Sequence, residues 1–212
     1  MPLIPLQVLP RFPVTDHRGG IAADNIGWQD LQGSIQQGSG VSALTSEVYR
    51  DTPFLMSFFR SGQVDKLSFI YQMSHEWQAG TKVRPHMHVL PMADPAVIQN
   101  VLIEGQYAWA NETTALPDNS GWTPFSIVAH INPGDVFKEK IIDLSGGNGI
   151  TPPAGVSESD LLFVFVQRTG NSGSDTYNTG KSGGTVLANL GLVSVDCHFQ
   201  IQKAGTQIEF SG

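Results

Sequence analysis

Alternation of hydrophobic and polar residues is the feature of this sequence that most limits its fold. Segments 66–73 and 97–109 alternate with a period of two, and segment 161–166 is hydrophobic throughout. The alternation is clearest in 192–201, where single polar residues separate five hydrophobic ones: Val193, Val195, Cys197, Phe199 and Ile201. Side chains of a β-strand point alternately to its two faces, so the alternating segments predict half-buried strands. Segment 161–166 predicts a strand that is covered on both faces.

The composition favours short strands and argues against long surface helices. Gly and Pro account for 23 and 13 residues, and only 15% of residues are charged, against roughly 25% in an ordinary soluble domain. Further strands are expected at 53–59, 82–90, 125–131 and 135–143, separated by turn-rich loops at 111–124, 144–160 and 170–184. We therefore predict an all-β fold, an antiparallel two-sheet sandwich of the jelly-roll type.

A proline-rich segment, residues 1–13, opens the chain and predicts an extended arm, because each proline fixes its own φ and keeps the preceding residue out of the helical region. The arm carries six hydrophobic side chains that need a surface to cover them: Leu3, Ile4, Leu6, Val8, Leu9 and Phe12. We expect these side chains to pack either against a neighbouring subunit or against their own domain. Residues 14–50 are interpreted as loops and short strands, with a helical turn around Trp28. We thus predict an arm and anchoring region at 1–52 and a jelly-roll domain at 53–212.

Charge and hydropathy exclude several classes of function. The net charge of −7 and the twelve scattered Lys and Arg residues argue against nucleic-acid binding. No stretch reaches the roughly 20 hydrophobic residues of a membrane span, and no signal peptide is visible. The single cysteine, Cys197, excludes a disulfide framework and is expected in the core.

Histidines form the most suggestive cluster of polar residues. His86 and His88 lie two apart in an expected strand, so they share a face, and two imidazoles at this spacing can reach one divalent metal. The run from Gly80 to His88 also matches the opening of the cupin metal motif. Met92 and Ala93 stand where that motif has Glu, and no His follows Pro133-Gly134-Asp135 at the required place. We therefore expect structural histidines and no cofactor, and keep a cupin-like metal-dependent enzyme, with His130 as a further ligand candidate, as the alternative.

Catalysis by a nucleophile is not indicated, because the adjacent Ser74, His75 and Glu76 point in divergent directions. Aromatic residues instead suggest assembly. They are numerous for a chain with so few charges, and we expect the following ones at exposed positions, where they can form subunit interfaces: Tyr107, Tyr177, Trp77, Trp109 and Trp122.

Three stretches of the sequence resemble a widespread group of phage and prophage virion proteins: FIYQMSHEWQAGTKVRPHMHV, VLIEGQYAWANETTALP and DTYNTGKSGGTVLANLGLVSVDCHFQIQKAGT. In that group a strand ending in PH-x-HW precedes an EY-x-WAN strand and a D-x-HYQ strand. The matching positions here are Pro85, His86 and His88; Tyr107, Trp109, Ala110 and Asn111; and Asp196, His198, Phe199 and Gln200. The resemblance covers about residues 64–208. Val89 replaces the usual Trp, and Glu104, Gly105 and Gln106 also depart from the pattern.

The resemblance implies a trimeric jelly roll that serves as a capsid decoration protein, a head fibre, or a tail spike or fibre knob. We therefore expect a non-enzymatic virion protein whose partners are its own copies and capsid or tail subunits, anchored by the arm. Five residues become candidates for the subunit interface: His86, His88, Tyr107, Trp109 and His198. The further alternative is a receptor- or glycan-binding knob that uses the loops 111–124 and 170–184.

Overall fold

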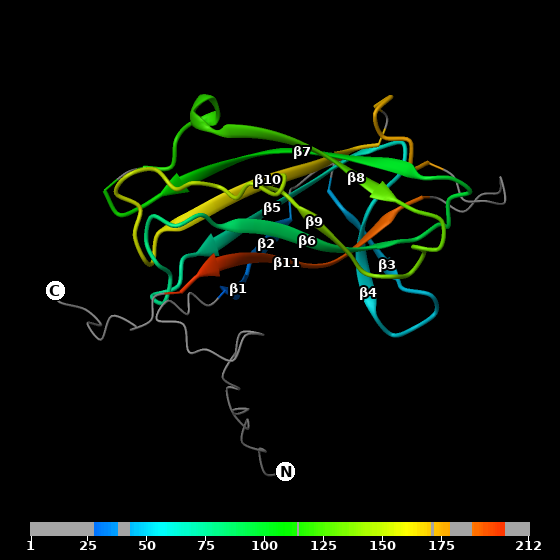
Figure 1. Ribbon diagram of the computed structural model, residues 1–212. Helices are drawn as coiled ribbons and strands as arrows, with labels where there is room; N and C mark the ends of the chain where they lie inside the picture. The colour runs from blue at the N-terminus through cyan, green and yellow to red at the C-terminus, as the bar shows by residue number, and fades with distance from the viewer. Residues whose placement is uncertain (1–27, 38–42, 114, 171, 179–187, 202–212) are drawn as a thin grey trace, which may run out of the picture.

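The computed structural model describes residues 28–37, 43–113, 115–170, 172–178 and 188–201, and these form two antiparallel β-sheets packed face to face (Figure 1). Sheet A has six strands: β1 (Trp28–Gln32), β3 (Thr45–Val48), β4 (Leu55–Phe59), β6 (Arg84–Pro91), β9 (Lys140–Asp143) and β11 (Leu190–Gln200). Sheet B has five: β2 (Ser34–Gln37), β5 (Val64–Gln72), β7 (Gln99–Ala110), β8 (Thr123–Ile131) and β10 (Leu161–Thr169). The only helix among the described residues is a single 3-10 turn, η1 (Asn119–Gly121). No helix in this part of the chain is long and apolar enough to cross a membrane.

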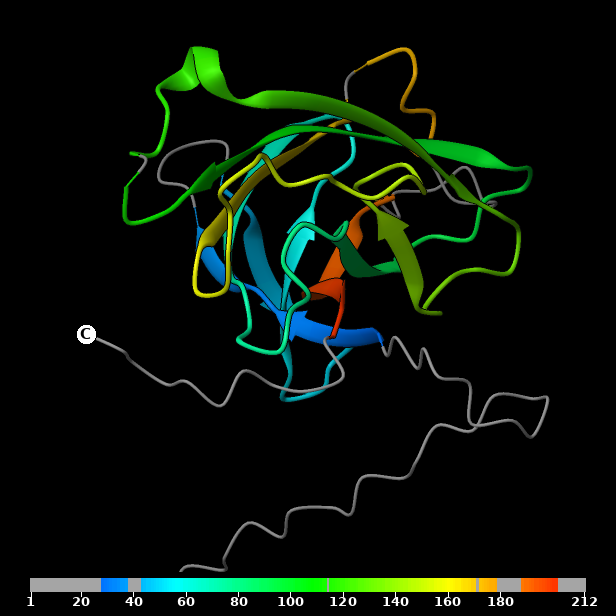
Figure 2. The same cartoon turned by 60° about the vertical axis from the view of Figure 1, so that its left-hand side comes forward.

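The strand order confirms the predicted jelly roll. The strands from β4 to β11 divide into two sets of four neighbouring strands. Their order is β4-β11-β6-β9 in sheet A and β5-β10-β7-β8 in sheet B. Along the chain these strands alternate between the two sheets, except at the hairpin β7–β8, which stays within sheet B. The first and last of these eight strands are neighbours in sheet A, as two interlocked Greek keys require. In Figure 2 the two sheets are seen as separate layers, with sheet B above sheet A.

The sandwich includes strands that lie before the predicted domain boundary at residue 53. β1, β2 and β3 all lie within 1–52, and each is paired with a strand of the sandwich: β1 with β11, β2 with β5, and β3 with β4. The helical turn expected around Trp28 is therefore wrong, because this segment pairs residue by residue with β11 as a strand. The hydrophobic arm residues 1–13 lie outside the described residues.

Alternation decides which side chains fill the core. In β5, Leu67, Phe69 and Tyr71 are fully buried between the sheets, as predicted. In β11, Val195 and Cys197 are buried, but Val193 is 46% exposed, although the pattern places it inside. The cause is a β-bulge between Leu192 and Ser194, which inserts one residue and reverses the side of the strand on which Val193 lies.

The predicted strand 135–143 is shorter than expected. A turn at Pro133-Gly134, where Gly134 has φ +85°, leads into Phe137 with φ +60°, and only Lys140–Asp143 forms β9. Asp135 holds this turn, since its carboxylate accepts from the Asn132 amide and from Lys140. A left-handed φ interrupts the extended backbone of a strand, so β9 begins only after Phe137.

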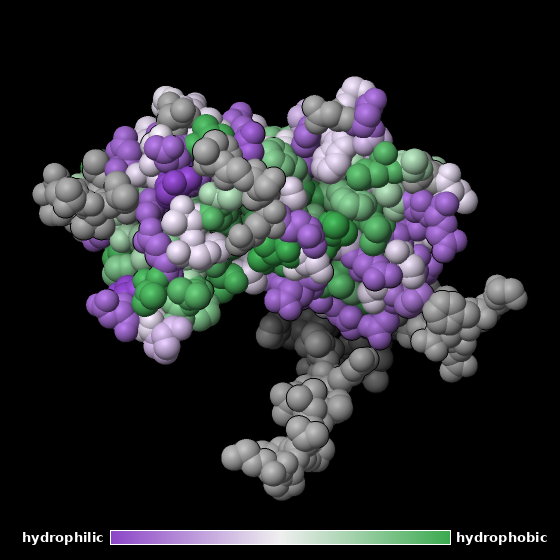
Figure 3. Space-filling model, turned by 180° about the vertical axis from the view of Figure 1, so that it is seen from behind, coloured by the Kyte–Doolittle hydropathy of each residue, from purple (hydrophilic) through white to green (hydrophobic). Residues whose placement is uncertain are grey.

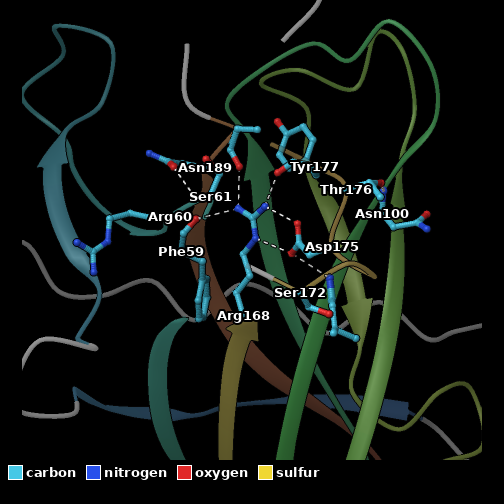
Figure 4. Close-up of polar contacts among 12 residues, drawn as sticks. Phe59, Arg60, Ser61, Asn100, Arg168, Ser172, Asp175, Thr176, Tyr177 and Asn189 are labelled. Carbon is cyan, nitrogen blue, oxygen red and sulfur yellow. Dashed lines mark hydrogen bonds and ion pairs between the residues drawn. The ribbon is translucent and has the colours of Figure 1, made fainter. Parts of the chain in front are cut away.

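A buried arginine closes one end of the sandwich (Figure 4). The guanidinium of Arg168, at the end of β10, donates to both carboxylate oxygens of Asp175 at 2.9 Å. It also donates to the carbonyls of Phe59, Ala188 and Tyr177, which come from three separate segments. Both charged side chains are fully buried. This ion pair therefore ties the 172–178 loop and the start of β11 to the core.

Candidate functional site

The outer face of sheet B has an apolar centre on β10. Leu161, Phe163 and Phe165 point away from the core and are only partly covered. In register, Phe163 is paired with Ile70 on β5 and with Ala108 on β7. A row of apolar side chains therefore crosses the middle three strands of this sheet on its solvent side.

Polar side chains surround this apolar centre. Lys66 lies with its Nζ 6.0 Å from the centroid of the Phe165 ring, and Glu104 accepts from the Thr169 hydroxyl at 2.5 Å. Ser68 and Gln106 flank Phe165 on the two neighbouring strands. On the face of the molecule seen from behind, hydrophobic areas lie interspersed with hydrophilic ones (Figure 3). An apolar centre with a polar rim is the pattern of a protein–protein interface.

The outer face of sheet A instead carries a cluster of histidines and carboxylates. His86 and His88 lie on β6, and Asp196 and His198 lie on β11, with Asp196 directly opposite His86. The ring of His86 lies between the other two, 5.0 Å from His88 and 4.3 Å from His198 by centroid. Asp30 on β1 pairs with His198, and its carboxylate is 2.6 Å from the Nε2 of His198.

Hydrogen bonds orient two of these imidazoles. The Nδ1 of His86 lies 3.1 Å from the carbonyl oxygen of Arg84, which can only accept, so Nδ1 carries the proton and Nε2 presents its lone pair. The Nδ1 of His88 lies 2.6 Å from Glu139 on the turn before β9, and its Nε2 lies 3.2 Å from the Oδ2 of Asp196. Ser194 donates to that same Oδ2.

Burial sets the protonation of the central histidine. The His86 residue is 3% exposed, and desolvation lowers its pKa. The nearby His198 and His88 lower this pKa further, against opposing effects of the Arg84 carbonyl and Asp196. His86 is therefore held in the neutral form, which is the form that binds metals.

The structure brings together only part of the predicted set. Three of the five interface candidates, His86, His88 and His198, share the outer face of sheet A. His130, the further metal candidate, lies on β8 in the other sheet and is hydrogen-bonded to Asn100 at 2.8 Å. It therefore cannot join a site with His86 and His88.

The other two interface candidates face the inside of the sandwich. Trp109 is 9% exposed and stacks on Trp77, with ring centroids 6.1 Å apart, and Tyr107 packs against the core. The expectation that the aromatics are exposed is thus wrong for Trp77, Trp109 and Tyr177. Tyr177 is fully buried, and its hydroxyl bonds to both the amide and the carbonyl of Ala93. These rings complete the core, where their large area stabilises the fold most.

A pocket of about 650 Å³ lies between the segment 110–113 and the loop 155–161. There the Oγ of Ser159, a residue with φ +68°, lies 3.2 Å from the Nε2 of His75. The amides beside this serine are already used: Ser159 donates to Met73, and Asp160 donates to Ser157. A serine nucleophile needs free amides to stabilise the oxyanion, so this pair lacks the usual support for acyl transfer.

Comparisons with known proteins identify no family. No family model and no curated protein matches the sequence. Among solved structures, the chain is similar to the family 30 carbohydrate-binding module of the cellulosomal cellulase Cel9D-Cel44B of Clostridium thermocellum. That similarity has a TM-score of 0.37 and 8% identity, and it covers 80% of this chain and 92% of the other.

Two further modules are similar at the same level. The family 11 module of Lic26A-Cel5E of Clostridium thermocellum gives a TM-score of 0.34 at 9% identity, covering 87% of this chain and all of that one. TmCBM61, solved in complex with β-1,4-galactotriose, gives 0.31 at 9%, covering 82% and 88%. These are likenesses of β-sandwich architecture and assign neither a family nor a ligand to this chain.

Proposed function

We propose that this chain is a non-enzymatic structural protein of a phage particle. In this proposal it assembles as a homotrimer, acts as a capsid decoration protein or as a head or tail fibre protein, and is held on the particle by its N-terminal arm. The three sequence stretches that resemble phage virion proteins suggest this class. The apolar outer face of sheet B is the single observation in the structure that supports it.

Phe163 and Phe165 are the main hydrophobic residues of this outer face. Both lie on β10, the central strand of sheet B, and both point away from a core that the intervening Val164 already helps to fill. A strand with two partly exposed phenylalanines on its outer face gains free energy when a second surface covers them, at about 25 cal/mol per Å² of apolar area buried. The polar groups around them, Lys66 and Glu104 among them, suit the rim of a contact between subunits.

Anchoring is assigned to residues 1–13. Their six hydrophobic side chains on a proline-restricted backbone lose little conformational entropy on docking. Three linked copies of such an arm bind a particle far more tightly than one copy does. Deletion of residues 1–13 should leave the melting temperature of the sandwich nearly unchanged and abolish attachment to the particle. Particle binding of the truncated chain at wild-type occupancy would contradict the anchoring role.

The oligomeric state tests the proposal directly. Sedimentation equilibrium should give a mass of about 69 kDa, three times the chain mass of 22.9 kDa. The double variant Phe163→Gln, Phe165→Gln should sediment as a monomer. Ile141→Gln is the matched control, because Ile141 is 58% exposed but lies on sheet A, and it should remain a trimer. A wild-type chain that stays monomeric, or a control that dissociates as readily as the double variant, contradicts the proposal.

A second candidate function, glycan binding, is favoured by the pocket beside the loop 111–124. Its lining is rich in hydrogen-bonding groups that suit sugar hydroxyls: Asn111, Glu112, Thr113, Ser157, Glu158 and Asp160. A glycan array probed with the wild type and with Glu112→Gln tests this function. Loss of a specific signal in the variant supports it, and an array without any signal rejects it.

A further inference from the structure

We infer that His86, His88 and Asp196 form a binding site for a divalent transition-metal ion such as zinc on the outer face of sheet A. The site does not depend on the proposed assembly, since it lies on the opposite sheet from the apolar face. Each of the three residues offers one ligand atom, and these atoms lie within 4.8 Å of one another. Two imidazole nitrogens and one carboxylate oxygen are the donors that zinc and its neighbours in the first transition series prefer.

The distance between two of the ligand atoms fits a metal ion. Ligand atoms about 2.0–2.1 Å from a tetrahedral zinc ion lie about 3.3 Å apart. The Nε2 of His88 and the Oδ2 of Asp196 are 3.2 Å apart, close to this spacing. An ion placed between them can bind both atoms without moving the strands, which are held in register by the β6–β11 ladder.

Both histidines are oriented as metal ligands. The Nδ1 of His86 donates to a backbone carbonyl and the Nδ1 of His88 is next to the Glu139 carboxylate, so in both residues Nε2 is the nitrogen left for the ion. Such outer contacts fix the tautomer and ring direction of metal-binding histidines. Asp196 is also held, because Ser194 donates to its carboxylate and the Tyr71 hydroxyl donates to its backbone carbonyl.

A second group on the same face, Asp30, His86 and His198, is the weaker candidate. Its carboxylate oxygen and the Nε2 of His198 are 2.6 Å apart, which is a hydrogen-bond distance and too short for two ligands of one ion. The side chains of Asp30 and His198 are also 63% and 43% exposed, against 18% for both His88 and Asp196. The geometry therefore selects the site that contains His88.

The site is open on the solvent side. His86 is buried at its base, while His88 and Asp196 form its walls and keep partial access to water. Three protein ligands leave at least one coordination position for water or for a group from another molecule. Because the ligands come from β6 and β11, a bound ion also links these two strands and stabilises the folded state.

The test uses the untagged full chain, freed of metal by dialysis against a chelator. Calorimetric titration with zinc chloride should show one equivalent bound. Loading with copper(II) should give an electron paramagnetic resonance spectrum with coupling to two imidazole nitrogens. The copper spectrum requires no variant, so it keeps the inference testable even if a substitution unfolds the chain.

Single substitutions distinguish a metal site from a network of ion pairs. His88→Gln and Asp196→Asn should each weaken zinc binding more than about 100-fold, and Glu139→Gln about 10-fold, since it removes only an orienting group. His130→Gln, on the other sheet, and His198→Gln should bind zinc nearly as the wild type does. No saturable zinc binding, or equal binding by His88→Gln and the wild type, would mean that the cluster is an ion-pair network only and would overturn the inference. Loss of binding in His198→Gln alone would also overturn it.

Discussion

The outer faces of sheets A and B start from the same strand alternation and end with different chemistry. On sheet A, the outward positions of β6 and β11 carry imidazoles and carboxylates that bond to one another. On sheet B, the outward positions of β10 carry Leu161, Phe163 and Phe165. The inward positions of the same strands are hydrophobic, apart from the buried Arg168 near the end of β10. The core therefore constrains only one side of each strand, and the other side is free to carry a function.

This difference separates two kinds of contact. A polar, hydrogen-bonded face stays hydrated and can select an ion, because each donor atom already has a fixed direction. An apolar face gains free energy from any surface of the right shape, so its specificity comes from the polar groups around it. We therefore expect substitutions on one face to leave the function of the other unchanged.

The largest expected effect comes from breaking the core that the two faces share. Arg168→Met removes one partner of a fully buried ion pair and leaves Asp175 charged and unpaired. The free energy of unfolding should fall by about 3–5 kcal/mol, as measured by urea denaturation, and both faces should lose their function together. Lys82→Met is the control, since Lys82 is exposed and bonds only to a loop carbonyl at 2.9 Å; it should change stability by less than about 0.5 kcal/mol. Equal stability of the two variants would show that the Arg168–Asp175 ion pair does not hold the sandwich together.

Two neighbours on β10 sharpen the comparison between inside and outside. Leu162 is fully buried, and Leu162→Ala should lower the free energy of unfolding by about 2–5 kcal/mol without preventing assembly of the folded chain. Phe163→Ser should have a smaller effect on stability, measured at a dilution where the wild type is monomeric, but should prevent assembly in sedimentation velocity. A Phe163→Ser chain that assembles as the wild type does would show that this face is not the interface.

Zinc provides the converse experiment. At a free concentration about 100 times the dissociation constant, it should raise the free energy of unfolding by about 2.7 kcal/mol. Phe163→Ser should gain the same amount, because its metal ligands are intact. His88→Gln should gain almost nothing. A gain that is reduced in Phe163→Ser would show that the two faces are coupled.

The sequence predicts the folding pattern better than the sites. The alternation in β5 and β11 correctly places Leu67, Phe69, Val195 and Cys197 in the core. It also places the polar residues of β11 together on one outward face. It cannot show that β11 lies beside β6, since their pairing joins residues about 110 positions apart in the chain and depends on the whole topology. The sequence alone therefore does not identify Asp196 as a neighbour of the histidines on β6.

Other features leave no local signal in the sequence. The bulge that exposes Val193 depends on how β11 meets its neighbours, and the pattern by itself continues through it. The hydrogen-bond acceptors of Arg168 belong to Phe59, Asp175, Tyr177 and Ala188, which come from separate segments of the chain. Only the tertiary structure brings them together, so the sequence does not show that this charge is buried. Trp109 shows the same limit, because an aromatic residue on an alternating strand fits a core and an interface equally well.

The smallest expected effect separates the His198–Asp30 pair from the His88–Asp196 pair on sheet A. Asp30→Asn removes the charge that faces His198, in a pair whose side chains are 63% and 43% exposed. Exposed pairs contribute about 0–1 kcal/mol, because water screens both charges and two side chains lose freedom on pairing. Urea denaturation should therefore find a change below about 1 kcal/mol, and calorimetry should find zinc affinity nearly equal to that of the wild type. Asp196→Asn has the same chemistry, one carboxylate changed to an amide beside a histidine on the same face, yet it should weaken zinc binding more than about 100-fold. If Asp30→Asn lost the ion while Asp196→Asn kept it, the metal would belong to the group of Asp30, His86 and His198, and the assignment of His88 as a ligand would be wrong.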